Sequence, residues 1–310
     1  MKIALARCEN LPYFESDDQL LWTTLKSLEI EIDCPVWDDA LVDWAQYDLI
    51  IPRLTWDYQE KMDAFQAWLV KYKSKFLNPY EVLDWNFSKS YLAELNCPLV
   101  PTIFLNQRTG DQGDLTMDEF KDIYQKLVDF IEDTKNDSSE QGAPIIFAKP
   151  MIGANSVGTL RISLEESNQA QLFEHLSKHL PYVGMLLQPY QASIESDGEF
   201  SLIFFDGKFS HAVQKKPMPG DYKAQIDYGA KDSVYEPSQT WIDESEKLVA
   251  SVQSKFNLSE PLLYARCDYL LSSKGMPLLI ELELIEPSLF FRGSQIKVDR
   301  FVTALLKRKS

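Results

Sequence analysis

Residues 264–287 read YARCDYLLSSKGMPLLIELELIEP, which predicts two apolar strands joined by a turn at residues 272–276. Asp268 lies in the first strand, and Glu281 and Glu283 lie two apart in the second. Because side chains alternate between the faces of a strand, Glu281 and Glu283 share a face, which Asp268 can join if the strands pair. Buried carboxylates are costly unless a cation compensates their charge, and magnesium prefers oxygen ligands. Spacing alone leaves two interpretations open, a metal site and a solvent-exposed acidic face.

A lysine and a loop of small residues precede this hairpin in the chain. Lys149 ends a strand in FAKP, and residues 153–158 then read GANSVG. A backbone of small residues can approach phosphate oxygens, and a nearby lysine neutralises their charge. The segment matches neither GxxxxGK[ST] nor GxGxxG, so a plain flexible turn is the alternative interpretation.

Two further segments favour a nucleotide site only in combination with the rest. Gln188 and Tyr190 end a strand and predict either a backbone that meets an adenine edge or a plain hinge between lobes. Lys215 and Lys216 close a hairpin and can either reach phosphates or guard an exposed strand end.

The N-terminal region predicts a small α/β lobe. Strands at 2–8 and 48–52 alternate with helices at 16–28 and 61–73, which implies a parallel sheet. Arg53, Trp56 and Asp57 follow the second strand, so we expect them on a loop at the carboxyl edge, where ligands bind.

The rest of the chain predicts mixed α and β structure in two further lobes. A helix at 85–95 carries Lys89, a capping box at Thr116 and Glu119 begins another helix, and Asp206-Gly207 predicts a hairpin turn. The other expected elements are strands at 100–105, 145–149, 159–163 and 184–189, helices at 165–179, 242–256 and 295–309, and a polar loop at 136–142.

Composition excludes several classes of protein. The formal net charge of −16 over 310 residues argues against nucleic acid as a partner, which calls for a basic surface. The acidic stretch 111–140 reads as a solvated helix and loop. Four scattered cysteines without a CxxC pair suit reduced thiols, and we see neither a signal peptide nor a membrane span. We therefore expect a cytoplasmic protein without a membrane partner; a homo-oligomer is compatible with the sequence.

The order of these motifs along the chain resembles the ATP-grasp superfamily, in which two α+β lobes clamp ATP. The resemblance implies a preATP-grasp (Rossmann-like) α/β lobe at 1–82, a small lobe with the glycine loop at 83–190, and a C-terminal lobe with the metal site at 191–310. Five segments look like the branch that contains the cycloserine-forming O-ureidoserine cyclo-ligase: TWDY (55–58), FQAWL (65–69), NPYEVLDWNFSKSYL (78–92), FFDGKFSHAVQKKP (204–217) and ELELIEPSLF (281–290).

The resemblance also implies roles for particular positions. Asp268, Glu281 and Glu283 match the magnesium ligands, although many members have Asn where this chain has Glu283. The residues that match ATP-binding positions are Lys89, Lys149, Gly153, Ser156, Gly158, Gln188, Tyr190 and Glu199.

The implied activity is an ATP-dependent carboxylate–amine ligase that releases ADP and works through an acyl phosphate. Arg266 and Lys215 are the candidate catalytic residues, with Arg266 and Arg53 suited to grip a carboxylate. Trp56, Asp57, Glu286 and Ser288 are candidates for the pocket of a small, amino-acid-like substrate. The alternatives are a nucleotide-binding ATP-grasp protein without turnover and an ATP-grasp kinase.

Overall fold

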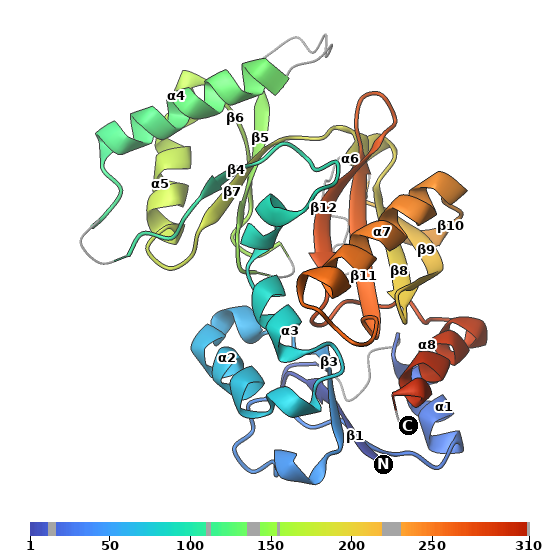
Figure 1. The fold of residues 1–310 in the computed structure, drawn as a ribbon. Helices are drawn as coiled ribbons and strands as arrows, with labels where there is room; N and C mark the ends of the chain where they lie inside the picture. The colour runs from blue at the N-terminus through green and yellow to red at the C-terminus, as the bar shows by residue number, and fades with distance from the viewer. Residues whose placement is uncertain (12–16, 110–112, 135–142, 154–155, 219–230, 309–310) are drawn as a thin grey trace.

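The computed structural model describes residues 1–11, 17–109, 113–134, 143–153, 156–218 and 231–308. Its strands form three sheets, and one sheet falls in each of the three predicted lobes (Figure 1). The lobe boundaries themselves stay a prediction. The predicted loop at 136–142 and the centre of the glycine loop, residues 154–155, lie outside the described residues.

The first sheet is parallel, as predicted. It has the order β2-β1-β3 and consists of β1 (Lys2–Arg7), β2 (Glu31–Asp33) and β3 (Leu49–Leu54). Its helices are α1 (Gln19–Ser27) and α2 (Met62–Lys71), with short 3-10 turns at Trp44–Gln46, Tyr58–Glu60 and Lys73–Lys75. The C-terminal helix α8 (Gln295–Lys307) returns to pack beside α1, so both ends of the chain share one apolar core (Figure 1).

Two predicted elements differ from the structure in this region. Strand β3 continues through Arg53, which is 1% exposed, so this residue is not on a loop. The predicted helix at 85–95 is two elements, α3 (Tyr80–Asn86) and a 3-10 helix at Lys89–Glu94. The Ser88 hydroxyl accepts a hydrogen bond from the N–H of Ser90 and thereby begins the second element separately.

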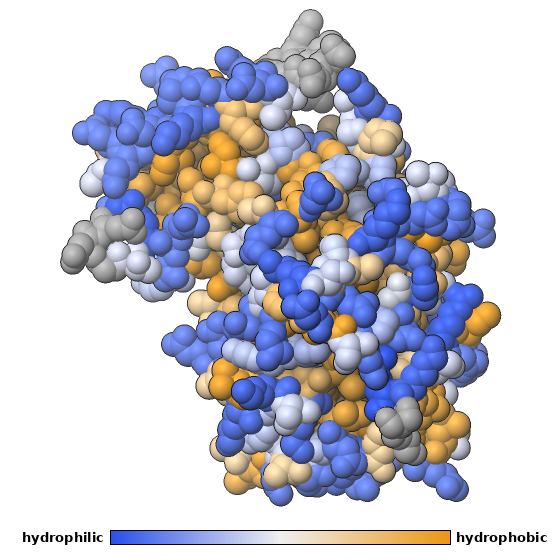
Figure 2. All heavy atoms as spheres, in the orientation of Figure 1, coloured by the Kyte–Doolittle hydropathy of each residue, from blue (hydrophilic) through white to orange (hydrophobic). Residues whose placement is uncertain are grey.

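The second sheet is antiparallel with the order β4-β7-β5-β6. It consists of β4 (Ile103–Leu105), β5 (Ile145–Pro150), β6 (Leu160–Ser163) and β7 (Met185–Pro189). The helices α4 (Met117–Thr134) and α5 (Gln169–His179) supply the rest of its core, and a 3-10 turn at Glu166–Asn168 precedes α5. The capping box is confirmed, since Thr116 and Glu119 bond each other's backbone N–H groups. Hydrophilic residues cover the outer side of α4, as expected for a solvated acidic helix (Figure 2).

The third sheet has the order β10-β9-β8-β11-β12. Its strands are β8 (Glu199–Phe205), β9 (Lys208–Lys216), β10 (Lys231–Tyr235), β11 (Tyr264–Leu271) and β12 (Pro277–Glu283). The helices are the short α6 (Ser193–Ser196) and α7 (Gln239–Lys255). Asp206 and Gly207 have φ values of 53° and 71°, which confirms the predicted hairpin turn. The exposed edge strand β10 was not predicted.

Candidate active site

A cavity of about 490 Å³ lies where the three lobes meet. Lys149 and Gln188 reach it from the second sheet, Glu199 and Asp268 from the third, and Trp56 from the loop that follows β3. A site of this kind, drawn from several elements, can hold a ligand larger than any one lobe could enclose.

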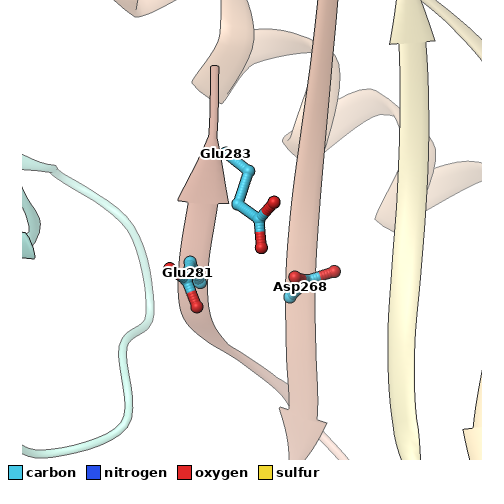
Figure 3. Close-up of side chains that lie close together, drawn as sticks. All are labelled: Asp268, Glu281 and Glu283. Atoms are coloured by element: carbon cyan, nitrogen blue, oxygen red, sulfur yellow. The ribbon is translucent and has the colours of Figure 1, made fainter. Parts of the chain in front are cut away.

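The acidic hairpin forms as predicted and faces this cavity. In the antiparallel pair β11 and β12, Asp268 lies opposite Glu281 and Arg266 lies opposite Glu283. One carboxylate oxygen from each of Asp268, Glu281 and Glu283 lies within 4.8 Å of the others, as Figure 3 illustrates. The side chain of Asp268 is 2% exposed and the two glutamates are about a quarter exposed, so this is not a freely solvated acidic face.

Each of the three carboxylates has a cationic partner. Arg266 pairs with Asp268 at 2.9 Å and also with Glu283, and Lys89 pairs with Glu281 at 3.0 Å. Burial opposes ionisation of Asp268, but Arg266 and Lys215 outweigh it and hold the pKa of Asp268 below its ordinary value.

Glu283 nevertheless holds its proton more tightly than a solvent-exposed glutamate does. Burial raises the pKa of Glu283 to about 7, with Glu281 and Asp268 adding to the shift and Arg266 opposing it. Three converging carboxylates are a donor set of hard oxygens. The residues therefore fit a divalent cation such as magnesium.

The two predicted phosphate lysines approach the same space from different elements. Lys89 donates a hydrogen bond of 2.7 Å to the carbonyl of Gly153, so the start of the glycine loop is tied to a residue that also pairs with Glu281. The Nζ of Lys149 lies 3.4 Å from the carbonyl oxygen of Ile280, and burial lowers the pKa of the Lys149 ammonium group.

Only some of the predicted glycine-loop residues line the cavity. Gly153 and Ser156 line it, whereas Gly158 does not. Gly158 has a φ of +71°, and an added Cβ would lie 2.9 Å from Pro150 and 3.0 Å from His179. Its glycine is therefore required for the conformation of the loop rather than for contact with a ligand.

The predicted nucleotide-binding residues at the far end also line the cavity. Gln188 donates to the hydroxyl of Thr102 at 2.8 Å, and the Tyr190 hydroxyl donates to Glu195 at 2.7 Å. Glu199 contacts Lys215 across the β8–β9 pair. Burial works against the charge of Lys215, but Asp268 and Glu199 outweigh it and raise its pKa.

The predictions for the substrate end need two corrections. Arg53 and Asp57 are absent from the described cavity wall. Arg53 grips Asp18 through bonds of 3.0 and 2.7 Å, and Asp57 instead accepts bonds from Trp37 and Lys61. Their side chains are committed to structural contacts, most of them with residues distant in sequence.

The other predicted residues of the substrate end, Trp56, Glu286 and Ser288, do line the cavity. Sequence reasoning missed Asp17, Phe290 and Arg292, which also line it. Phe290 belongs to the ELELIEPSLF segment, so the sequence carried a signal for it.

Residues 285–290 follow β12 as an irregular segment whose backbone is held by side chains. Each of its six consecutive carbonyls accepts one hydrogen bond from a different residue, and Phe290 adopts a φ of 52°. The donors, in order from Ile285 to Phe290, are Tyr264, Trp56, Arg53, Arg266, His211 and Lys297, at 2.7, 3.1, 2.8, 3.3, 2.9 and 2.8 Å. Glu286 and Ser288 therefore project from a fixed backbone.

Comparison with known proteins agrees with this geometry. Residues 3–78 match the family model described as "D-cycloserine synthetase DcsG, N-terminal domain". The chain is 27% identical over 292 residues to the cycloserine biosynthesis protein DcsG of Streptomyces lavendulae, covering 88% of this chain and 87% of that protein. The crystal structure of D-cycloserine synthetase DcsG matches with a TM-score of 0.84 at 24% identity over 100% of both chains. D-alanine--D-alanine ligase from Bacillus anthracis matches with a TM-score of 0.58 at 16% identity, again over 100% of both chains.

The chain has the fold of the ATP-grasp ligases that it matches, so the predicted fold class is confirmed. Within that class the resemblance to the D-cycloserine synthetase branch is confirmed as well. The relatives are named a cycloserine biosynthesis protein, a synthetase and a ligase, which agrees with the predicted ATP-dependent ligase and favours neither alternative. In the described parts of the chain, none of the helices combines the length and the apolar character that a membrane crossing requires.

Proposed function

We propose that this chain is a magnesium-dependent ligase that uses ATP to activate the carboxylate of a small, amino-acid-like molecule and then forms a C–N bond. One observation carries the proposal: the converging carboxylates of Asp268, Glu281 and Glu283 share one cavity with Lys89 and Lys149. An ATP-grasp ligase named PsnB, solved with its minimal precursor, magnesium and ADP, has a TM-score of 0.57 to this chain at 13% identity, over 99% of this chain and 98% of that one.

In this proposal the chain binds ATP between the second and third sheets. Gln188, Tyr190 and Glu199 hold the nucleoside end, and Lys149, Lys89 and the glycine loop face the phosphates. Asp268, Glu281 and Glu283 would hold magnesium, which supplies neutralisation of phosphate charge and alignment of the oxygens. Positioning and electrostatic stabilisation account for most catalysis in phosphoryl transfer, and a cavity lined by fixed cations suits that requirement.

The chemistry then follows in two steps. The substrate carboxylate attacks the γ-phosphorus of ATP, the bond to the β,γ-bridging oxygen breaks, and an acyl phosphate and ADP result. A nitrogen lone pair next attacks the acyl carbon, phosphate leaves, and the nitrogen loses a proton. Arg266 lies against Asp268 and Glu283, so its role is to fix those carboxylates and to add positive charge near the transferred group.

The proposal also covers the setting of the enzyme. We also propose a cytoplasmic location, a small-molecule substrate and no nucleic-acid or membrane partner. The oligomeric state is to be measured.

The test is turnover of purified protein with magnesium and ATP. A panel of amino acids and O-substituted serines should produce ADP and phosphate together with a product whose mass shows a new C–N bond. Asp268→Asn and Glu281→Gln should abolish ADP release, whereas Asp243→Asn, an exposed position on α7, should not change it. Unchanged turnover in the first two variants would show that the metal assignment is wrong, and a phosphorylated end product would favour a kinase.

A further inference from the structure

One acidic side chain at the substrate end of the cavity has no hydrogen-bond or ion-pair partner among the described residues. Glu286 is 8% exposed and lines the cavity. Among the described residues, no hydrogen bond or ion pair to its carboxylate is found. Its oxygens are also not among the fully enclosed unpartnered atoms, so they can be reached, and the space that they border is the cavity.

The cations near Glu286 are already committed elsewhere. Lys89 and Arg266 are the positive groups that act on it through space. Lys89 is bonded to Glu281 at 3.0 Å and to the carbonyl of Gly153 at 2.7 Å. Arg266 is bonded to Asp268 and Glu283. A buried carboxylate without its own cation is unfavourable, so Glu286 either keeps a proton or takes a cationic ligand that stabilises its charge.

The proposed metal site does not supply that partner. The group of converging carboxylates in the described residues comprises Asp268, Glu281 and Glu283, and Glu286 is outside it. A single further carboxylate is a poor site for a second divalent ion, which needs several oxygen ligands.

The position of Glu286 is fixed before any ligand arrives. Its own carbonyl accepts from the indole N–H of Trp56 at 3.1 Å, and the carbonyls on either side are held by Tyr264 and Arg53. Trp56 and Tyr58 also line the cavity, and burial, together with the charge of Glu286, raises the pKa of Tyr58. A carboxylate flanked by aromatic side chains is suited to an organic ammonium group, which aromatic faces also attract.

We propose that Glu286 binds the ammonium group of the substrate, so that this end of the cavity selects carboxylic acids that also carry a protonated amine. The inference rests on the proposed function, because it assumes that the substrate carboxylate lies toward the metal site. It makes Glu286 the residue that distinguishes an amino acid from the same acid without its amine.

The test compares pairs of probes that differ only in the amine. We would use D- and L-alanine against propionate, and D- and L-O-ureidoserine against 3-(ureidooxy)propionate, titrated calorimetrically into the full chain with saturating MgADP. The wild type should bind at least one amine-bearing probe about tenfold or more tightly than its partner, as a charged buried hydrogen bond implies. Glu286→Gln keeps the shape of the side chain and should reduce the preference to within about twofold.

Two controls separate this effect from damage to the fold or to the nucleotide site. Glu81→Gln, at an exposed position on α3, should keep the full preference. The affinity of Glu286→Gln for MgADP and its melting temperature report on folding, and Glu286→Asp, which keeps the charge, should retain part of the preference if Glu286→Gln does not fold.

Each outcome decides a different claim. Equal binding of both members of every pair, no binding of any probe, or a preference that persists in Glu286→Gln would overturn the assignment of Glu286. If the amine preference depends on Glu286 but no probe supports ADP release, the assignment stands and the proposed ligase activity fails.

Discussion

Replacement of Arg53 by methionine tests whether this residue supports the fold or grips the substrate. Arg53 and Asp18 form a bidentate ion pair, with hydrogen bonds of 3.0 and 2.7 Å and side chains that are 2% and 3% exposed. A third bond of 2.8 Å holds the carbonyl of Pro287. Arg53→Met leaves Asp18 charged and unpaired in the interior, which should lower the free energy of unfolding by about 3–5 kcal/mol.

The companion variants identify the source of that loss. Asp18→Asn combined with Arg53→Met removes the stranded charge, so the double variant should recover most of the loss and remain below the wild type by about 1 kcal/mol for the bond to Pro287. Urea denaturation followed by tryptophan fluorescence measures each value, because the chain has seven tryptophans. Arg53→Met that unfolds like the wild type while raising the KM for the carboxylate would refute the structural role and restore the substrate contact.

Three further predictions concern other parts of the site. Glu283→Asn keeps an oxygen ligand but removes a charge, so half-maximal ADP release should require roughly tenfold more magnesium; an unchanged magnesium titration would show that Glu283 is not a ligand. Burial raises the pKa of Glu286 from 4.5 to about 8, so the folded protein holds this proton more tightly than the unfolded chain does. The contribution of this proton to the free energy of unfolding is complete below pH 4.5 and is lost as the pH rises through about 8. Glu286→Gln should therefore raise the melting temperature relative to the wild type increasingly from about pH 5 to about pH 8, and a constant difference would contradict the burial argument. Asn78 bonds the carbonyls of Tyr264 and Leu284 and the N–H of Leu263, so Asn78→Ala should lower the free energy of unfolding by about 3 kcal/mol or more, and a loss below about 1 kcal/mol in urea would contradict this.

The acidic hairpin was predictable because its information is local. Alternation within β12 places Glu281 and Glu283 on one face, and a short turn brings Asp268 opposite Glu281. The parallel N-terminal sheet and the Thr116 capping box were predictable for the same reason, since periodicity and capping depend on neighbours in sequence.

The roles of Arg53 and Asp57 were not predictable in this way. Arg53 sits at the carboxyl end of a strand, where ligand contacts are common, and nothing nearby in sequence reveals that Asp18 will meet it in the interior. The metal and nucleotide roles themselves came from motif order and stay proposals, because spacing describes which side chains converge and not what they bind.

The six held carbonyls of residues 285–290 also constrain how this enzyme could diversify. The donors come from four separate parts of the chain, so inserting or deleting a residue within the segment would misalign the pairings on one side of the change. Insertions and deletions, which loops usually tolerate, are therefore unfavourable in this segment. New substrate preference at this end would have to arise by exchanging side chains at positions such as Glu286 and Ser288 on an unaltered backbone, which makes those two positions the natural targets for redesign.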